Sequence, residues 1–343
     1  MKTLEEFNAF LDQQLRDELG ALEQQRITGR NWIRWIWVAT LAPFAIFVFF
    51  IVRYSLRSAG NTAGEDTAGY GNQVFLLVGM VVLVTLAGYA VRYFMVKRKG
   101  LNEATDYQHD FKNRIVKPLI SFINPSFQYQ PLNHASYEEF TESGLFETKA
   151  YQMTGNDQVY GKLGEMNFQF CDLRVTHMPL VTLRGQGPDT VFSGSYFIAQ
   201  FPRYFSTPVY VLSRNNSASG DGYIRTWHLG KKVLPADAAF NKLFMVYAPD
   251  EAAAQQLLTP ALMEKIVALY ERTPAKLFIS FYNNRIYVGV GHGTDYFETT
   301  LNRSLQDRQL LTDFYLDFMS MLQLAEDLKN NLRIWTSRSF SQS

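Results

Sequence analysis

Two apolar runs separated by a short polar loop constrain this sequence most strongly. Residues 32–52 read WIRWIWVATLAPFAIFVFFIV, and residues 74–96 read VFLLVGMVVLVTLAGYAVRYFMV. Each run has the roughly 20 residues that a helix needs to cross the hydrocarbon core of a bilayer. The centre of each run lacks charged side chains, and a charge placed there would cost about 2.5–3.5 kcal/mol. The sequence therefore predicts a two-helix transmembrane hairpin, with residues 53–73 as its connecting loop.

Basic residues flank the outer ends of both runs, whereas the loop contains only Arg53 and Arg57. The flanking residues are Arg26, Arg30, Arg34, Arg92 and the triplet Lys97-Arg98-Lys99. Positive charge collects on the cytoplasmic side of membrane helices. We therefore expect a multi-pass membrane protein, with both termini cytoplasmic and the loop external. The triplet either contacts anionic lipid headgroups or only sets the topology.

Two amphipathic segments adjoin the hairpin. Residues 1–31 carry an apolar stripe at helical spacing, and residues 97–135 contain a second one within a helix over 101–123, perturbed by Pro118. The first stripe comprises Leu4, Phe7, Leu11, Leu15, Leu19 and Leu22. We expect the two stripes to pack together into a helical cytoplasmic stalk. The open alternative is a contact with a second copy of the chain, which would make a homo-oligomer.

Residues 136–335 have the pattern of an α+β domain with a mainly antiparallel sheet and flanking helices. Ser136 and Glu139 fit a capping box, with Gly144 at the helix end. Strand patterns fill 149–248, including one at 223–229 and one at 242–248.

The rest of this domain is predicted to be two helices, a hairpin and a long final helix. The helices span 250–258 and 260–272, and the hairpin KLFISFY-Asn283-Asn284-RIYVGVG follows. The last helix spans 305–329. Its inward residues are Leu310, Leu311, Phe314, Phe318, Met321, Leu322 and Ala325. Residues 336–343 are predicted to be a polar, frayed tail.

Composition excludes several classes of function. The net charge of +1 argues against a nucleic-acid partner, which requires a basic surface. The single cysteine excludes an internal disulfide and a cysteine-based zinc site. The five histidines lack ligand spacing, and the glycine-rich stretch 289–293 ends a strand rather than opening a helix. We expect no metal and no cofactor.

One predicted strand, 166–178, contains Cys171, Asp172 and His177. Cys171 and His177 share a face but lie about 20 Å apart on a straight strand, which excludes a direct dyad. The apolar side of the strand changes from even to odd positions at Cys171-Asp172. This change predicts a β-bulge or a change of covering layer there.

Several of these segments together resemble the bacterial membrane-protein family known as domain of unknown function 3137, some members of which are labelled "galanin". The similar segments include VYGKLGEMNFQFCDL at 159–173, VFSGSYFIAQFPRYF at 191–205 and AEDLKNNLRIW at 325–335. The resemblance extends over nearly the whole chain, including the N-terminal hairpin. Family members commonly have Ser-Glu where Cys171-Asp172 stands here, so the thiol is not expected to be an obligatory nucleophile. The resemblance implies no activity, and it suggests a LemA-type membrane protein as a partner.

The sequence as a whole favours a non-enzymatic binding or scaffold module at the inner membrane, with the lipid bilayer and a protein as partners. No catalytic residues are assigned. The alternatives are an oligomeric membrane-organising scaffold and an enzyme with a pocket in the sheet domain. For the enzyme, the candidate residues are Asp172, His177, His228 and His292.

Overall fold

The computed structural model describes most of the chain outside the two apolar runs. The described residues are 2–31, 106–146, 151–177, 189–214, 228–272, 276–291, 304–330 and 335–339, with single positions at 49, 53, 89, 90, 93 and 297. Within these ranges, no helix combines the length and apolar character required to cross a bilayer. The predicted hairpin falls almost entirely outside them.

The contacts divide the chain into two units. Unit 1 comprises residues 1–13, 116–298 and 308–343, and unit 2 comprises residues 14–115 and 299–307. The sheet domain is therefore part of unit 1.

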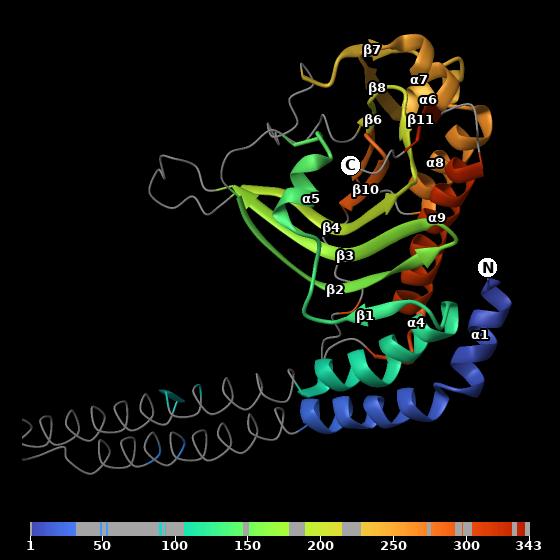
Figure 1. Cartoon of the computed structure of the whole chain (residues 1–343). Helices are drawn as coiled ribbons and strands as arrows, with labels where there is room; N and C mark the ends of the chain where they lie inside the picture. Colours follow the sequence, from blue (N-terminus) through green and yellow to red (C-terminus); the bar gives the residue numbers. More distant parts are fainter. Residues whose placement is uncertain are drawn as a thin grey trace, which may run out of the picture. The chain divides into compact units, whose positions relative to one another are not determined.

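A nine-stranded antiparallel sheet forms the centre of unit 1 (Figure 1). The hairpin β9–β10 lies between β4 and β6, so the middle of the sheet comes from a late part of the chain. In spatial order the strands are β1 (Gln128–Gln130), β2 (Tyr151–Leu163), β3 (Met166–His177), β4 (Asp189–Gln200), β10 (Arg285–Gly291), β9 (Lys276–Tyr282), β6 (Val209–Ser213), β8 (Phe244–Ala248) and β7 (Lys231–Val233). The predicted α+β class with an antiparallel sheet is confirmed.

One face of the sheet is covered by long helices, and we call it the helical face. The rings of Phe314 and Phe318 in α9 (Gln309–Asn330) contact Phe170 of β3. Further along, Tyr270 of α8 (Pro260–Arg272) contacts Phe244 of β8. The two remaining helices near this end are α6 (Ala238–Leu243) and α7 (Glu251–Leu257). All seven inward residues predicted for the last helix are buried.

The opposite face is covered in part by the short helix α5 (Tyr137–Glu142), and we call it the α5 face. Phe140 of α5 contacts Phe192 and Tyr196 of β4. The predicted capping box is present: Ser136 Oγ accepts from the Glu139 N–H, and the Glu139 carboxylate accepts from the Ser136 N–H. These bonds fix α5 over the sheet, and they fix the position of Glu139.

The β9–β10 hairpin forms with the predicted two-residue turn. Asn283 has φ +54°, a conformation that asparagine tolerates better than most residues. The buried Asn284 side chain donates to the Phe201 carbonyl at 3.0 Å. The turn therefore also holds the segment that follows β4.

Two other elements depart from the sequence prediction, and a third lies mostly outside the described residues. Residues Trp335–Ser339 form β11, which pairs with β5 (Arg203–Phe205), so the predicted frayed tail is wrong over this stretch. Positions 242 and 243 end α6, which begins after its N-cap Asp237, so the predicted strand at 242–248 begins only at Phe244. The predicted strand at 223–229 lies outside the described residues except for its last two positions, which are not strand.

The predicted N-terminal helix is interrupted at residues 14–15, between α1 (Leu4–Gln13) and a helix over 16–31. In unit 1, Phe10 of α1 stacks on Phe122 of α4 (Lys117–Ile123), with ring centroids 4.2 Å apart. In unit 2, Arg114 Nε donates to Glu18 at 2.6 Å. The expected contact between the two amphipathic segments is therefore present.

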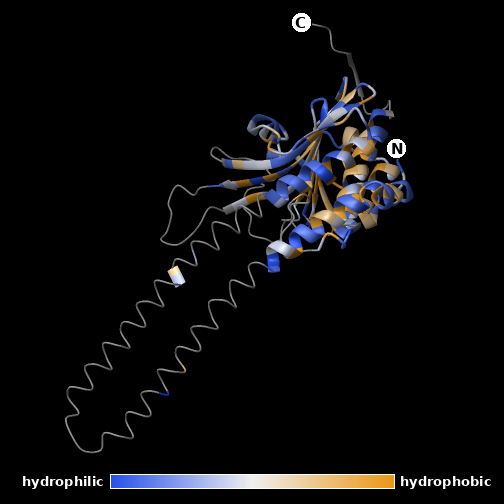
Figure 2. Ribbon diagram, turned by 90° about the horizontal axis from the view of Figure 1, so that it is seen from below, coloured by the Kyte–Doolittle hydropathy of each residue, from blue (hydrophilic) through white to orange (hydrophobic). Residues whose placement is uncertain are grey.

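Pro118 perturbs its helix as predicted. A five-residue π-helix, Lys112–Val116, directly precedes α4. Proline lacks an N–H and clashes with the preceding turn, and a π-bulge absorbs that clash. The second helix thus changes its hydrogen-bonding pattern just before the sheet domain. The ribbon coloured by hydropathy shows apolar and polar residues interleaved along the helices of the described part of the chain (Figure 2).

Candidate functional site

Along β3, the buried side chains change from one face of the sheet to the other at Cys171-Asp172. This change has two structural causes. Asp157 and Gln158 of β2 lie opposite the single residue Cys171, so the bulge is in the neighbouring strand, where Asp157 has φ +59°. In addition, all residues from Phe170 to Leu173 are buried. The helical face is covered along the first half of β3 and the α5 face along the second half. The predicted irregularity is therefore confirmed.

The candidate residues of the enzyme alternative do not assemble within the described part of the chain. Asp172 is buried and accepts from Ser195 Oγ at 2.7 Å. His177 lies five residues further along the same strand, on the other face and about 16 Å away. The ring nitrogen Nε2 of His228 contacts the Gly144 carbonyl at 2.9 Å. His292 lies outside the described residues.

Cys171 is unsuited to nucleophilic chemistry. Its side chain is completely buried, and its sulfur accepts from the Ala135 N–H at 3.4 Å. Burial raises the pKa of the thiol far above its ordinary value. Because the thiolate is the reactive form, the folded protein keeps this thiol inert.

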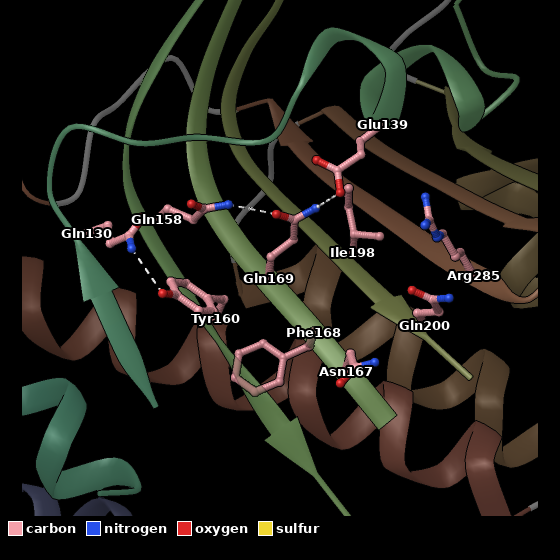
Figure 3. A pocket seen from close by; sticks show the side chains of 10 residues that line it. All are labelled: Gln130, Glu139, Gln158, Tyr160, Asn167, Phe168, Gln169, Ile198, Gln200 and Arg285. Atoms are coloured by element: carbon pink, nitrogen blue, oxygen red, sulfur yellow. Dashed lines mark hydrogen bonds between the residues drawn. The ribbon is translucent and has the colours of Figure 1, made fainter. Parts of the chain in front are cut away.

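The α5 face contains a pocket of about 290 Å³ where α5 leaves the sheet uncovered (Figure 3). Its lining is dominated by primary amides from β1, β2, β3 and β4, together with Tyr160 and Ile198. One carboxylate, Glu139, and one guanidinium, Arg285, complete its polar surface, so their formal charges cancel. The five amides are Gln130, Gln158, Asn167, Gln169 and Gln200.

Half of this lining is held by two chains of hydrogen bonds (Figure 3). In one, Gln158 Nε2 donates to Gln169 Oε1 at 2.7 Å, and Gln169 Nε2 donates to Glu139 Oε1 at 2.6 Å. In the other, Gln130 Nε2 donates to the Tyr160 hydroxyl at 2.9 Å. These side chains are fixed by one another before any ligand arrives.

The guanidinium of Arg285 is held by α5. It forms an ion pair with Glu142, whose carboxylate also accepts from the Tyr287 hydroxyl at 3.3 Å. Burial is the main cause that raises the pKa of Tyr287, so this phenol remains a neutral donor. Both charged residues at the pocket therefore have polar partners, and the site presents no isolated charge.

Two of the remaining lining residues, Asn167 and Gln200, are open to a ligand. The side chains of Asn167 and Gln200 make no hydrogen bond to any other residue that the structure describes. Asn167 is exposed and Gln200 is half-buried. Gln200 lies directly between Asn167 and Arg285 in the sheet register. With strands about 4.8 Å apart, these three residues make a row about 10 Å long.

Sequence reasoning missed this pocket because its residues are spread over more than 150 positions. A weak signal was nevertheless present. Polar side chains recur at alternate positions in Gln158-x-Tyr160 and Asn167-x-Gln169. Residues two apart in a strand share a face, so this pattern indicates a polar sheet face. The pattern does not predict that helix α5 would lie over part of that face and form one wall of the pocket.

Comparison with known proteins places part of this architecture in a family. The family model described as "Protein of unknown function (DUF3137)" matches residues 190–330. The predicted family is confirmed over these residues. The DUF3137 match runs from the start of β4 to the end of α9 and includes Gln200 and Arg285. The residues that β1, β2, β3 and α5 contribute to the pocket precede it.

A search of curated proteins gives no match. Among solved structures, the crystal structure of the mycobacterial trehalose monomycolate transport factor A, TtfA, is similar at 9% sequence identity and a TM-score of 0.32. The similarity covers 64% of this chain and 93% of that chain. A score this low does not establish a shared fold, so it carries no argument about function.

The lining of the pocket is rich in amides and poor in the residue types of common catalytic sites. Glu139 is the only carboxylate among its lining residues, whereas glycoside hydrolysis requires a pair of carboxylates. The lining contains no serine, cysteine, histidine or lysine. Among the described residues, no group of three or more histidine, cysteine or acidic side chains is placed to hold a metal ion. The arrangement can donate and accept many hydrogen bonds at fixed positions.

Proposed function

We propose that this protein is a membrane-anchored binding module whose α+β domain holds its ligand or partner on the α5 face. The observation that carries the proposal is the pre-arranged amide pocket. Binding sites have a small number of fixed polar groups that set the orientation of the ligand. Here those groups are fixed by bonds such as Gln158–Gln169 and Gln169–Glu139.

The anchor in this proposal is the pair of apolar runs at 32–52 and 74–96. Its support is their length, their uncharged centres and the basic residues outside them. On this proposal both termini are cytoplasmic, and the protein resides in a bacterial inner membrane. The lipid bilayer is then one partner, and a LemA-type membrane protein is the protein partner that the family resemblance suggests.

A binding role is better supported than an oligomeric scaffold. The scaffold would use the apolar stripe of the N-terminal helix against another copy. In this chain, Phe7 of that stripe stacks on Tyr315 of α9, with ring centroids 4.2 Å apart, and the nearby Phe10 stacks on Phe122. These residues are thus engaged within the chain.

The anchor is tested with reporter fusions after Ser343 and within the loop 53–73. A cytoplasmic reporter is expected to be active at Ser343 and inactive in the loop, while alkaline phosphatase gives the reverse pattern. Resistance of the chain to alkaline carbonate extraction is expected as well. Alkaline phosphatase activity at Ser343, or release of the chain by carbonate, would refute the anchor as proposed.

Binding on the α5 face is tested by photo-crosslinking in intact cells. A photoreactive amino acid at Asn167 is expected to give a specific adduct of defined mass. The matched control position is Gln152, an exposed residue of β2 that is not part of the pocket lining. Equal labelling from both positions, or none from Asn167, would contradict a binding role for this face.

A further inference from the structure

We propose that the amide pocket recognises a neutral carbohydrate, which deepens the binding role proposed above and rests on it. Three properties of the pocket support this assignment: the kind of hydrogen-bonding groups, their charge balance and their spacing. Each is a property of residues in unit 1.

The hydrogen-bonding groups match hydroxyls. A primary amide offers one acceptor oxygen and two donor hydrogens, and a hydroxyl group both donates and accepts. Five amides and the Tyr160 phenol line the same pocket. Of these amides, Asn167 and Gln200 make no hydrogen bond to another described residue, so a ligand with several hydroxyl groups can satisfy both halves of each, whereas an apolar ligand would leave them unpaired.

The charge balance favours a neutral ligand. The pocket contains one acidic and one basic side chain, Glu139 and Arg285. Both oxygens of Glu139 already accept hydrogen bonds, from Gln169 and from the Ser136 N–H. Arg285 is paired with Glu142. An anionic ligand would approach a site whose guanidinium is already neutralised, so no net attraction remains for it.

The spacing suits a ring with hydroxyls around its edge. The fixed groups on β2 and β3 lie on one side, and the row Asn167–Gln200–Arg285 lies on the other. Tyr160 contributes a half-exposed aromatic ring, and Ile198 contributes an apolar side chain. Sugars present C–H groups on their ring faces and hydroxyls on their edges, and this lining offers a partner for each.

An extended peptide is the less suitable ligand. Peptides that add to sheets do so at an edge, where backbone groups are unpaired. Apart from Gln130 of the edge strand β1 and Glu139 of α5, the lining residues of this pocket lie on strands β2, β3, β4 and β10, each of which has a strand on both sides. Its recognition groups are therefore side chains on a sheet face, at a volume suited to one small ligand rather than to a peptide segment.

The test measures binding of glucose, galactose, N-acetylglucosamine, maltose and cellobiose to the full chain by saturation-transfer NMR and calorimetry. The protein is purified in a zwitterionic detergent, because glycoside detergents would compete for the pocket. At least one of these sugars is expected to bind. The ring analogue tetrahydropyran-2-methanol, which lacks the secondary hydroxyls, is expected to show no saturation transfer.

Variants then locate the binding. Asn167→Ala combined with Gln200→Ala is expected to weaken binding by about tenfold or more, since each lost hydrogen bond is worth roughly 1 kcal/mol. Tyr160→Phe, which retains the ring but removes the hydroxyl, is expected to weaken it less. Gln152→Ala is the matched control and is expected to bind as the unmodified chain does.

Three results would overturn the carbohydrate assignment: no sugar of the panel binds, glucose 6-phosphate binds more tightly than glucose, or the double variant binds unchanged. None of these would alter the photo-crosslinking or topology results, so a protein adduct at Asn167 without sugar binding refutes the ligand class alone. Conversely, sugar binding by a chain that carbonate releases refutes the anchor alone.

Discussion

The ion pair between Glu23 and Arg26 provides the sharpest test of the packing in unit 2. Both residues are almost fully buried, with exposed fractions of 6% and 4%. The Glu23 carboxylate accepts from Arg26 at 2.6 and 2.9 Å, from Ser304 Oγ at 2.8 Å and from the Leu305 N–H at 3.0 Å. This one carboxylate therefore joins the N-terminal helix to a turn nearly 300 residues later in the chain.

The free energy that the Glu23 carboxylate contributes to stability can be estimated from its pKa. Hydrogen bonding to Arg26, with further bonds from Leu305 and Ser304, lowers that pKa from 4.5 to about 2. A shift of that size corresponds to about 3 kcal/mol of stabilisation at neutral pH. Glu23→Ala would also leave the Arg26 charge buried without this partner, and breaking a buried pair in this way costs about 3–5 kcal/mol.

Hydrogen exchange at the Leu305 amide is the direct assay, since that N–H donates to Glu23. We expect Glu23→Ala to accelerate its exchange about 100-fold, the factor that corresponds to roughly 3 kcal/mol. The control is Glu18→Ala, which removes the solvent-exposed ion pair with Arg114 in the same unit. Exposed pairs contribute about 0–1 kcal/mol, so the control should change exchange little.

The hydrogen bond from the Leu305 N–H to Glu23 makes the protection of this amide from hydrogen exchange depend on pH in one direction. The folded pKa of Glu23 lies below the unfolded value, so its contribution is complete above pH 4.5. It is lost as the pH falls from about 4.5 towards 2. Exchange at Leu305 that is equal in both variants, or a contribution that grows on acidification, would refute this reasoning.

Four further tests have defined expected outcomes. A Cβ at Gly155 would lie 2.5 Å from the Asp172 carbonyl oxygen, so Gly155→Ala should destabilise unit 1 by about 1–3 kcal/mol in chemical denaturation. Gly20→Ala, with nothing within 4 Å of the added carbon, should instead stabilise its helix by about 0.5–1 kcal/mol; equal effects of the two would contradict the packing described. Cys171 should resist thiol reagents at neutral pH until the protein is unfolded, and rapid labelling of the folded chain would show that it is not buried. Ser136→Ala should cost about 1 kcal/mol through loss of the N-cap, measured by thermal unfolding, and no change would mean that α5 does not depend on its capping box.

Elements with strong local signals were predictable from the sequence. The turn residues Asn283-Asn284 between two alternating apolar runs predicted the β9–β10 hairpin, and the stripe from Leu310 to Ala325 predicted α9. In both, the residues that determine the structure are neighbours in the chain. Local conformational preference and tertiary packing then favour the same conformation.

Elements whose structure depends on contacts with residues far away in the sequence were not predictable in this way. Thr154-Gly155-Asn156-Asp157 has the composition of a turn, yet it continues β2 through a bulge, because Asp157 takes the positive φ inside the strand. Strand β11 has a polar sequence and depends on pairing with β5, 130 residues earlier. The amide pocket needed the register of β2, β3, β4 and β10, which no single segment encodes.

The position of the β9–β10 hairpin in the middle of the sheet determines the order in which this sheet can be completed during synthesis. Strand β4 ends at Gln200, and its neighbour β10 ends only at Gly291, 91 residues later. A ribosome adding about 5–20 residues per second needs roughly 5–18 s to produce that interval. Throughout this time the inner edges of β4 and β6 are unpaired, and such edges are the usual starting points of aggregation. A newly made chain therefore exposes these two edges until the hairpin closes the gap between the two halves of the sheet.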